Sequence, residues 1–337
     1  MIDLSTRYLG LDLKNPLVPS SSPLTGDFDM ARRLEDAGAA ALVLPSLFEE
    51  EVVAEQEMLH RFLDQQDIGH AEADTFLPEA GEEYVSHLDR YLERIQRYKA
   101  ALDIPVIGSL NGVTDEGWLD HARDLEQAGC DALELNVYFV AADADESAAA
   151  VEARYLDLLR HVRGTVRIPV TVKLSSQLSS VAYMVKQLEA CGAQGVSLFN
   201  RFYQPDLDLE SLALVPRIHP SSAAESLLRI RWIGLLRPQV GLSLAATGGF
   251  QDHRQTLKAL LVGADVVQFC HVLLERGPAH LGQVLTDLHR WMEEHEYQSV
   301  EQLKGSVCQS HAQNPAEFER ANYVDVLDSH TPARGVR

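Results

Sequence analysis

The chain has 337 residues, of which 46% are hydrophobic, and its formal net charge is -21. This length and composition suit one large globular domain, which we expect to span residues 1–337. The negative charge argues against nucleic acid and anionic membrane surfaces as partners, because the electrostatic term would oppose both.

The cysteines stand apart in the sequence, at Cys130, Cys191, Cys270 and Cys308. They form no CxxC pair, so the sequence predicts no disulfide scaffold, no metal site and no iron–sulfur cluster. The amino terminus lacks the basic segment and apolar run of a signal peptide, and no apolar stretch reaches the roughly 18 residues that span a bilayer. We therefore expect a soluble, cytoplasmic protein.

A helix end, a glycine and a short apolar strand recur along the chain. The pattern is clearest in residues 34–44 and returns in 125–135, 188–198 and, more loosely, 260–269. Each copy holds the last turn of an amphipathic helix, a glycine suited to a left-handed cap and an apolar strand. Strands alternating with helices across unequal loops predict a parallel sheet rather than a solenoid.

Eight strands are predicted in chain order, at residues 16–20, 40–45, 105–109, 132–136, 169–174, 195–200, 242–247 and 265–269. Eight parallel strands with intervening helices predict a TIM (β/α)8 barrel. Residues 281–296 are predicted as its closing helix and 299–305 as a short appended element. The polar tail, residues 306–337, is expected to pack around the outside or onto a partner subunit.

Two connections are too long for a simple βα unit. They run over about residues 46–80 and 201–222, and each follows the carboxyl end of a strand. Long loops in compact domains are commonly functional lids. We therefore expect both to arch over the carboxyl-terminal face of the barrel, where such folds place their chemistry.

Lys173 ends the stretch Ile-Pro-Val-Thr-Val-Lys-Leu-Ser that starts at Ile168. Alternating β-branched residues predict a buried strand, and a lysine directly after them is poorly explained as a core residue. Other residues suited to a site also follow predicted strands: Ser20, Ser21, Asn136, Asn200, Gly248, Gly249, Cys270 and His271.

The glycines after the seventh strand, with backbone amides after the eighth, are typical of a barrel's phosphate site. Taken singly, Asn136, Lys173 and Asn200 are each explained as ordinary loop side chains. Together with a phosphate site they favour a phosphorylated cofactor with a flat polar ring, because the lysine would offset charge on the ring and the amides would bind its edges.

The chain resembles the dihydroorotate dehydrogenase family, most closely its soluble class 1, over nearly its full length. The similarity lies in residues 9–23, 128–136, 169–175, 247–249, 263–268 and 294–305. It implies an amino-terminal hairpin, FMN as cofactor, oxidation of dihydroorotate to orotate in pyrimidine biosynthesis, and a homodimer. It also implies a flavin site lined by Ser20, Ser21, Asn136, Lys173, Asn200, Gly248 and Gly249, with the backbones of Cys270 and His271 near the phosphate.

The loop after Asn136 departs from the family pattern. There the family has Asn-x-Ser-Cys-Pro-Asn, or serine in place of the cysteine, and that residue takes a proton from the substrate. This chain reads Asn-Val-Tyr-Phe-Val-Ala, so Phe139 holds the position of the base and cannot accept a proton. Pro45 and about Ala73 stand where the family has a lysine and an asparagine. We therefore expect weak or absent activity on dihydroorotate.

General acid–base chemistry needs another titrating group, and the available ones are Tyr138, Arg201, His219 and His271. Tyr138 and Arg201 lie beside the two retained asparagines and are the first catalytic candidates with Lys173, although each alone is also explained as structural or substrate-orienting.

Three hypotheses remain open. The leading one is an FMN-dependent oxidoreductase that moves a hydride between a CH–CH group of a small molecule and the flavin. The second is oxidation or reduction of another ring or conjugated acid, with Tyr138 as proton donor. The third is a flavin-binding or cofactor-free barrel with a non-catalytic partner or regulatory role, which the loss of the base would suit. Since the chain has no nicotinamide fingerprint, we expect no second redox centre in it.

Overall fold

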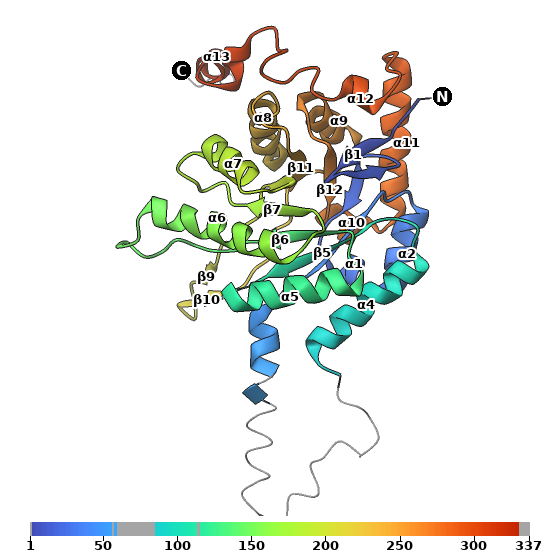
Figure 1. Cartoon of the computed structure of the whole chain (residues 1–337). Coiled ribbons are helices and arrows are strands. Elements are labelled where there is room, and N and C mark those ends of the chain that lie inside the picture. Colours follow the sequence, from blue (N-terminus) through green and yellow to red (C-terminus); the bar gives the residue numbers. More distant parts are fainter. Residues whose placement is uncertain (1, 56, 59–84, 113–114, 330–337) are drawn as a thin grey trace, which may run out of the picture.

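A computed structural model describes residues 2–55, 57–58, 85–112 and 115–329. Eight parallel strands form one sheet in the order β3-β12-β11-β8-β7-β6-β5-β4. Their bounds are β3 Leu17–Pro19, β4 Leu42–Phe48, β5 Val106–Asn111, β6 Ala132–Asn136, β7 Val170–Leu174, β8 Gly195–Leu198, β11 Ser243–Thr247 and β12 Val266–Phe269. The two end strands also meet, because the amide of Ala40 donates to the carbonyl of Leu17 at 3.0 Å. The predicted barrel is confirmed (Figure 1).

Proline precedes three of the barrel strands without breaking the sheet. Pro16, Pro105 and Pro169 have no amide hydrogen to donate. Their carbonyl oxygens still accept hydrogen bonds from a neighbouring strand of the sheet, from the amides of Val267, Leu42 and Leu133 at 2.8, 3.0 and 2.9 Å respectively. Proline is tolerated at the first position of a strand because no ladder donor is needed there.

Helices surround the strands in Figure 1. Their bounds are α1 Pro23–Gly26, α2 Phe28–Asp36, α4 His87–Ala101, α5 Asp115–Ala128, α6 Ala148–Thr165, α7 Val181–Ala190, α8 Ser226–Leu236 after the 3-10 turn η1 Ala223–Glu225, α9 His253–Val262, α10 His271–Arg276 and α11 Ala279–Glu294. The recurring glycines after α2, α5, α7 and α9 have positive φ, 103° at Gly38, 105° at Gly129, 96° at Gly192 and 115° at Gly263. This left-handed backbone is the cap that the repeated motif predicts.

The predicted start of the first lid is wrong. The strand expected to end at Pro45 continues to Phe48, with a register shift between Val43 and Ser46, and residues 49–55 are helical. Proline cannot donate to the ladder, so β4 bulges at Pro45 and resumes pairing beyond it. Residues 59–80 of this lid lie outside the described part. The second lid holds a hairpin that the sequence did not indicate, β9 Asp206–Asp208 paired with β10 Ala213–Val215.

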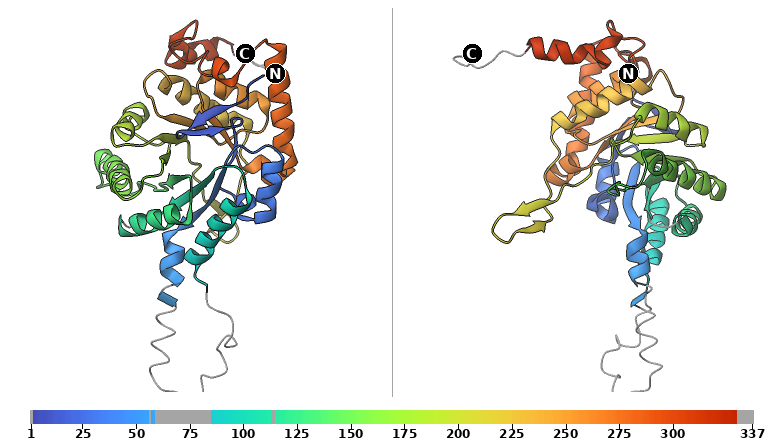
Figure 2. Two further views of the ribbon diagram at one scale, coloured as in Figure 1. Left: turned by 45° about the vertical axis from the view of Figure 1, so that its right-hand side comes forward. Right: turned by 90° about the vertical axis from the view of Figure 1, so that its left-hand side faces the viewer.

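The two ends of the barrel are covered by different segments. The hairpin that the resemblance implies, β1 Thr6–Tyr8 with β2 Leu11–Leu13, lies at the amino-terminal end, whereas β9 and β10 project from the opposite end (Figure 2). The tail beyond α12, Val300–Leu303, continues through η2, Pro315–Phe318, to α13, Ala321–Ser329. It packs on the outside of α8, where Arg231 donates to the carbonyl oxygen of Phe318 at 2.7 Å.

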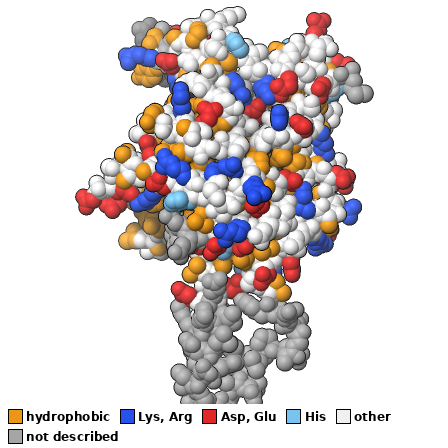
Figure 3. Space-filling model, in the orientation of Figure 1, with side chains coloured by type: hydrophobic (Ala, Val, Ile, Leu, Met, Phe, Trp, Pro, Cys, Tyr) orange, Lys and Arg blue, Asp and Glu red, His pale blue; other side chains and the backbone are white. Residues whose placement is uncertain are grey.

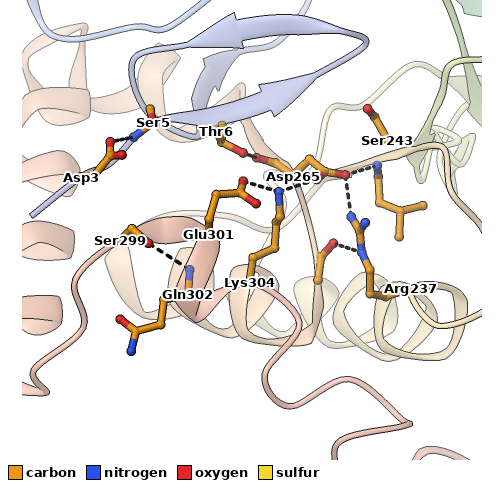
Figure 4. Close-up of polar contacts among 12 residues, drawn as sticks. Asp3, Ser5, Thr6, Arg237, Ser243, Asp265, Ser299, Glu301, Gln302 and Lys304 are labelled. Carbon is orange, nitrogen blue, oxygen red and sulfur yellow. Dashed lines mark hydrogen bonds and ion pairs between the residues drawn. The ribbon is translucent and has the colours of Figure 1, made fainter.

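An ion network ties the carboxyl-terminal segment to the amino-terminal end of the barrel (Figure 4). The carboxylate of Asp265 pairs with Arg237 at 2.5 Å and with Lys304 at 3.0 Å, and Lys304 also reaches Glu301 at 2.5 Å. These groups line a cavity of about 800 Å³ beside Thr6. Their mutual pairing indicates a structural role in joining α12 to the barrel.

Charged side chains are mixed on the surface. On the face shown in Figure 3, basic and acidic groups are interspersed. Ion pairs between such groups include Lys99 with Asp131, at 2.7 Å. Within the described ranges, no helix combines the length and apolarity needed to cross a bilayer.

Candidate functional site

A cavity of about 520 Å³ opens at the carboxyl ends of the strands. It is lined by every residue predicted for the site: Ser20, Ser21, Asn136, Tyr138, Lys173, Asn200, Arg201, Gly248, Gly249, Cys270 and His271. These residues lie at the carboxyl ends of six strands, β3, β6, β7, β8, β11 and β12, or on the loops after them, and the barrel brings these strand ends to one edge. Their chemical roles stay predictions.

Lys173 reaches the cavity floor from β7 and forms an ion pair there. Its ammonium lies 3.4 Å from Oε1 of Glu134 on β6, the neighbouring strand, and the two side chains are 11% and 0% exposed. Glu134 also accepts hydrogen bonds from Ser197 at 2.9 Å and Gln268 at 3.4 Å. A buried carboxylate needs such partners, so Glu134 holds the lysine at the edge of the cavity.

Sequence reasoning missed Glu134. Its signal was a single glutamate in the strand Ala-Leu-Glu-Leu-Asn, which is otherwise apolar up to Asn136. An acidic residue is almost never fully buried without a partner, so a glutamate inside a buried parallel strand indicates a nearby cation. Lys173 was the cation available in the sequence.

A chain of polar side chains crosses the cavity wall. Asn200 donates from Nδ2 to Oδ1 of Asn136 at 2.6 Å, and Asn136 donates from Nδ2 to the hydroxyl of Ser46 at 3.1 Å. The hydroxyl of Ser46 then contacts that of Ser109 at 2.8 Å. The two predicted asparagines therefore orient each other, and Ser46, just beyond the bulge at Pro45, supports them.

Asn111 is a second residue that sequence reasoning missed. It ends β5, lines the cavity and is 6% exposed, yet its carboxamide makes no hydrogen bond to the described residues. Because the carboxamide lines the cavity and bonds to no described group, it is a candidate for contact with a ligand. Its signal in the sequence was a polar residue at the predicted end of the third strand.

The turn after β11 contains the predicted glycines. Gly248 and Gly249 have φ of 94° and 86°, and a Cβ on Gly249 would lie 2.6 Å from the amide nitrogen of Ser226. A Cβ on Gly248 would lie 2.9 Å from the guanidinium of Arg229. Only glycine allows this backbone so close to the amino end of α8, where backbone amides are suited to binding an anion.

Arg229 lies beneath this turn and is 6% exposed. It donates to the carbonyl oxygens of Thr247 at 3.0 Å and Glu225 at 2.9 Å. Burial lowers the pKa of its guanidinium from the usual range, although the carboxylate of Glu225 opposes that effect. Sequence reasoning missed this arginine because it stands inside a helix, 19 residues before Gly248 in the chain.

Cys270 lies across the cavity, where its thiol faces the carbonyl oxygen of Ser21 at 3.7 Å. Burial raises the pKa of this thiol, and the nearby charge of Lys173 counters the rise. A protonated thiol is a weak nucleophile, so the environment favours a packing role for Cys270. His271 begins α10 and lies 3.9 Å from Glu275.

The candidate acid–base residues occupy different environments. Tyr138 is 39% exposed, and its ring packs against Phe202 with centroids 4.5 Å apart. Arg201 pairs with Glu225 at 3.2 Å and donates to the carbonyl of His219, whose own side chain is exposed. Tyr138 and Arg201 line the cavity, whereas His219 does not.

Phe139 lies outside the cavity lining. Its ring packs beneath the guanidinium of Arg154 on α6, 4.5 Å from the ring centroid. The position expected to hold the base therefore supplies neither a titrating group nor a cavity wall here. Ala73, at the position of the family's asparagine, lies outside the described residues. Within the described ranges, no cluster of three or more potential ligands could hold a metal ion.

Comparison with known proteins finds relatives over most of the chain. Dihydroorotate dehydrogenase B (NAD(+)), catalytic subunit, of Thermoplasma acidophilum is 22% identical over 324 residues, covering 90% of this chain and 99% of the relative. Dihydroorotate dehydrogenase A (fumarate) of Lactobacillus helveticus is 22% identical over 334 residues, covering 97% of both chains. The NAD-dependent dihydropyrimidine dehydrogenase subunit PreA of Escherichia coli is 22% identical over 325 residues, covering 90% of this chain and 76% of the relative.

No family model matches the chain. The relatives nevertheless confirm the resemblance predicted from the motifs, because most of the chain is similar to dihydroorotate dehydrogenases at 22–25% identity.

Proposed function

We propose that this protein is an FMN-dependent oxidoreductase that acts on a CH–CH group of a small molecule. The observation that carries the proposal is the arrangement of the cavity. At one end the buried guanidinium of Arg229 lies beneath the turn of Gly248 and Gly249. At the other end Lys173 stands on β7, between β6, which ends at Asn136, and β8, which leads to Asn200. A phosphorylated ring cofactor needs both ends at once. The homodimer implied by the resemblance and the cytoplasmic location remain predictions.

The residues present fit FMN. The turn of Gly248 and Gly249, the amino end of α8 and the guanidinium of Arg229 would hold the phosphate. Lys173 and the carboxamides of Asn136 and Asn200 would bind the ring. When bound, FMN would supply the acceptor for two electrons.

The chain's own groups have defined tasks in this scheme. The ammonium of Lys173, held by Glu134, would offset negative charge that develops beside it, because a fixed cation in a buried site needs no reorganisation. The aromatic rings of Tyr138 and Phe199 would limit water at the cavity. Tyr138 is the hydroxyl that lines the cavity beside the position of the missing base, so it is the candidate proton donor.

A second function is favoured by Phe139. Because its ring packs against Arg154 instead of lining the cavity, the chain has lost the base that its family uses. A flavin-binding or cofactor-free barrel with a partner or regulatory role would need no base. Oxidation of dihydroorotate is expected to be slow or absent under either function.

The test is a visible absorption spectrum of the purified protein, with the released cofactor identified by mass. We expect a yellow protein carrying FMN, and a colourless protein that takes up no added FMN would contradict the proposal. Dihydroorotate oxidation at rates normal for the family would contradict the role assigned to Phe139.

The phosphate end can be tested separately with Arg229→Met. We expect this variant to lose at least about tenfold in FMN affinity while riboflavin, which lacks the phosphate, binds as before, since a charged hydrogen bond contributes roughly 1.5–3 kcal/mol. Arg231→Met, on the same helix but bonded to the tail, is the matched control. Equal losses for FMN and riboflavin would indicate a purely structural arginine.

A further inference from the structure

The amino-terminal hairpin of β1 and β2 is inserted into the barrel. Tyr8 and Leu9, at its turn, are fully buried and pack in one cluster with residues of the barrel strands, among them Val18 of β3, Ala132 of β6 and Ala245 of β11. The side chains of the hairpin turn therefore form the lower part of the barrel core.

The fold holds this turn in place against a local cost. Leu9 has a φ of 53°, in the left-handed region that side chains rarely adopt. Its amide donates to the hydroxyl of Ser243 at 3.0 Å, and its side chain fills the space beside Gly195, where a Cβ would lie 2.5 Å from Cδ2 of Leu9. Such strain persists only where the surrounding contacts fix it, so the barrel keeps the neighbouring Tyr8 inside it.

Polar side chains lie between Tyr8 and the floor of the cavity. Thr171 and Lys173 are two residues apart on β7 and so share its inward face. Glu134 on β6 is in register with Thr171, and Ser197 on β8 is in register with Lys173. The ion pair of Glu134 and Lys173 therefore rests on a layer of hydroxyl groups that the hairpin closes from below.

Two of these hydroxyls have no hydrogen-bond partner among the described residues, those of Tyr8 and Thr171, and both side chains are fully buried. Burial raises the pKa of the Tyr8 hydroxyl and the carboxylate of Glu134 raises it further, whereas Thr171 and Ser197 lower it. Tyr8 therefore stays protonated and lies beside both hydroxyls as a donor. A buried hydroxyl left unpaired is costly, so we expect these groups to pair.

We infer that Tyr8 is a positioning residue for the ion pair of Glu134 and Lys173, and that it acts through Ser197. Small side-chain shifts let Thr171 donate to the hydroxyl of Tyr8 and let Tyr8 donate to that of Ser197, which itself donates to Glu134 at 2.9 Å. A hydroxyl can accept while it donates, so this order satisfies both unpaired groups. Every hydrogen of the chain then points toward the carboxylate, and aligned hydroxyls strengthen one another.

The inference rests on the proposed function and gives the amino-terminal hairpin a part in it. The carboxylate of Glu134 competes with bound FMN for the ammonium of Lys173. Hydrogen bonds donated to the carboxylate weaken its hold on the ammonium, which leaves more of that charge to offset negative charge on the ring. Loss of the Tyr8 hydroxyl should therefore disfavour the reduced cofactor.

The hydrogen bonds are tested without cofactor in Tyr8→Phe, which removes the hydroxyl and keeps the ring. We expect a lower midpoint of urea unfolding than in the wild-type protein, because hydrogen bonds are lost. An unchanged or higher midpoint would overturn the inference, since removing a hydroxyl that has no partner relieves its cost of burial.

The positioning role is tested in the FMN-loaded protein by equilibration with a reference dye. We expect Tyr8→Phe to weaken the binding of reduced relative to oxidised FMN about threefold, a fall of roughly 15 mV in the two-electron potential. Tyr98→Phe is the matched control, because Tyr98 is equally buried but donates to the carbonyl oxygen of Thr25 at 3.1 Å, outside the barrel strands. It should lower the urea midpoint and leave the potential unchanged. A wild-type potential in Tyr8→Phe would overturn the positioning role.

Ser197→Ala tests the path from Tyr8 to the carboxylate. In this background Tyr8→Phe should cause no further change in potential, because the link to Glu134 is already broken. Additive changes would contradict the path through Ser197. Failure of the wild-type protein to take up FMN would count against the proposed function, whereas the urea measurement still tests the hydrogen bonds, so the two failures are distinguishable.

Discussion

Replacing Glu134 by glutamine removes one charge from the ion pair beneath the cavity and changes little else in shape. The carboxylate is fully buried and accepts from Lys173, Ser197 and Gln268. A glutamine can keep its carbonyl oxygen toward Lys173 and donate from its amide nitrogen to the hydroxyl of Ser197, so the main change is the loss of one negative charge. The ammonium of Lys173, 11% exposed, is left without its counter-charge.

The expected cost follows from that burial. Removing one partner of a buried ion pair costs about 3–5 kcal/mol, because the remaining charge stays desolvated. Lys173→Met should cost a similar amount, since it leaves the carboxylate of Glu134 alone. The double variant Glu134→Gln/Lys173→Met removes both charges and should be less destabilised than the sum of the two single variants.

The free energy of unfolding is measured by urea denaturation followed by circular dichroism, without added FMN so that ligand binding does not contribute. Asp120→Asn is the control, because Asp120 and Arg123 form a pair whose side chains are 71% and 53% exposed. That substitution should change the free energy of unfolding by no more than about 0.5 kcal/mol. A loss below about 1 kcal/mol in Glu134→Gln, or strict additivity in the double variant, would refute the reasoning.

Two further predictions concern the glycine turn and a buried thiol. Gly249→Ala should abolish FMN binding, because the φ of 86° and a Cβ that would lie 2.6 Å from the amide nitrogen of Ser226 both oppose a side chain. Gly10→Ala is the control, since Gly10 has a similar φ of 80° but nothing within 4 Å of its Cβ position. This variant should lower the free energy of unfolding by only about 1–2 kcal/mol and keep FMN. Equal FMN binding by the two variants would show that close packing at the turn is unimportant. Cys130 should resist alkylation by iodoacetamide at about pH 9 in the folded protein and react in urea. The thiolate is the nucleophile, and burial raises the pKa of the Cys130 thiol to about 12. In the folded protein the thiol therefore stays protonated until the pH nears that value. Mass mapping checks this against the partly exposed Cys191, and rapid labelling of Cys130 in the folded state would contradict its burial.

Local sequence patterns determined the barrel. The repeated helix, glycine and strand motif depends on neighbouring residues alone, and it predicted the strands and the left-handed glycines after α2, α5, α7 and α9. Because parallel strands end at one edge, residues after them were predicted to meet, and all of those predicted for the site line one cavity.

Tertiary structure decided which partners these residues have. Glu134 and Lys173 stand 39 residues apart on adjacent strands, and Ser46 and Asn136 are separated by 90 residues, so neither contact follows from local periodicity. The extension of β4 beyond Pro45 also depends on its pairing with β5, where Phe48 faces Asn111. A proline marks a break in the ladder but does not show that pairing resumes after it.

The charge balance of the cavity is likewise a property of the fold. Arg201 and Arg229 look alike in the sequence, yet one meets the carboxylate of Glu225 and the other bonds to backbone carbonyls beneath a glycine turn. Electrostatic energy depends on distance and burial, which the barrel sets by bringing distant segments together. The residue types of the site were therefore readable from the sequence, but which of its cations remain available to a ligand was decided by the tertiary structure.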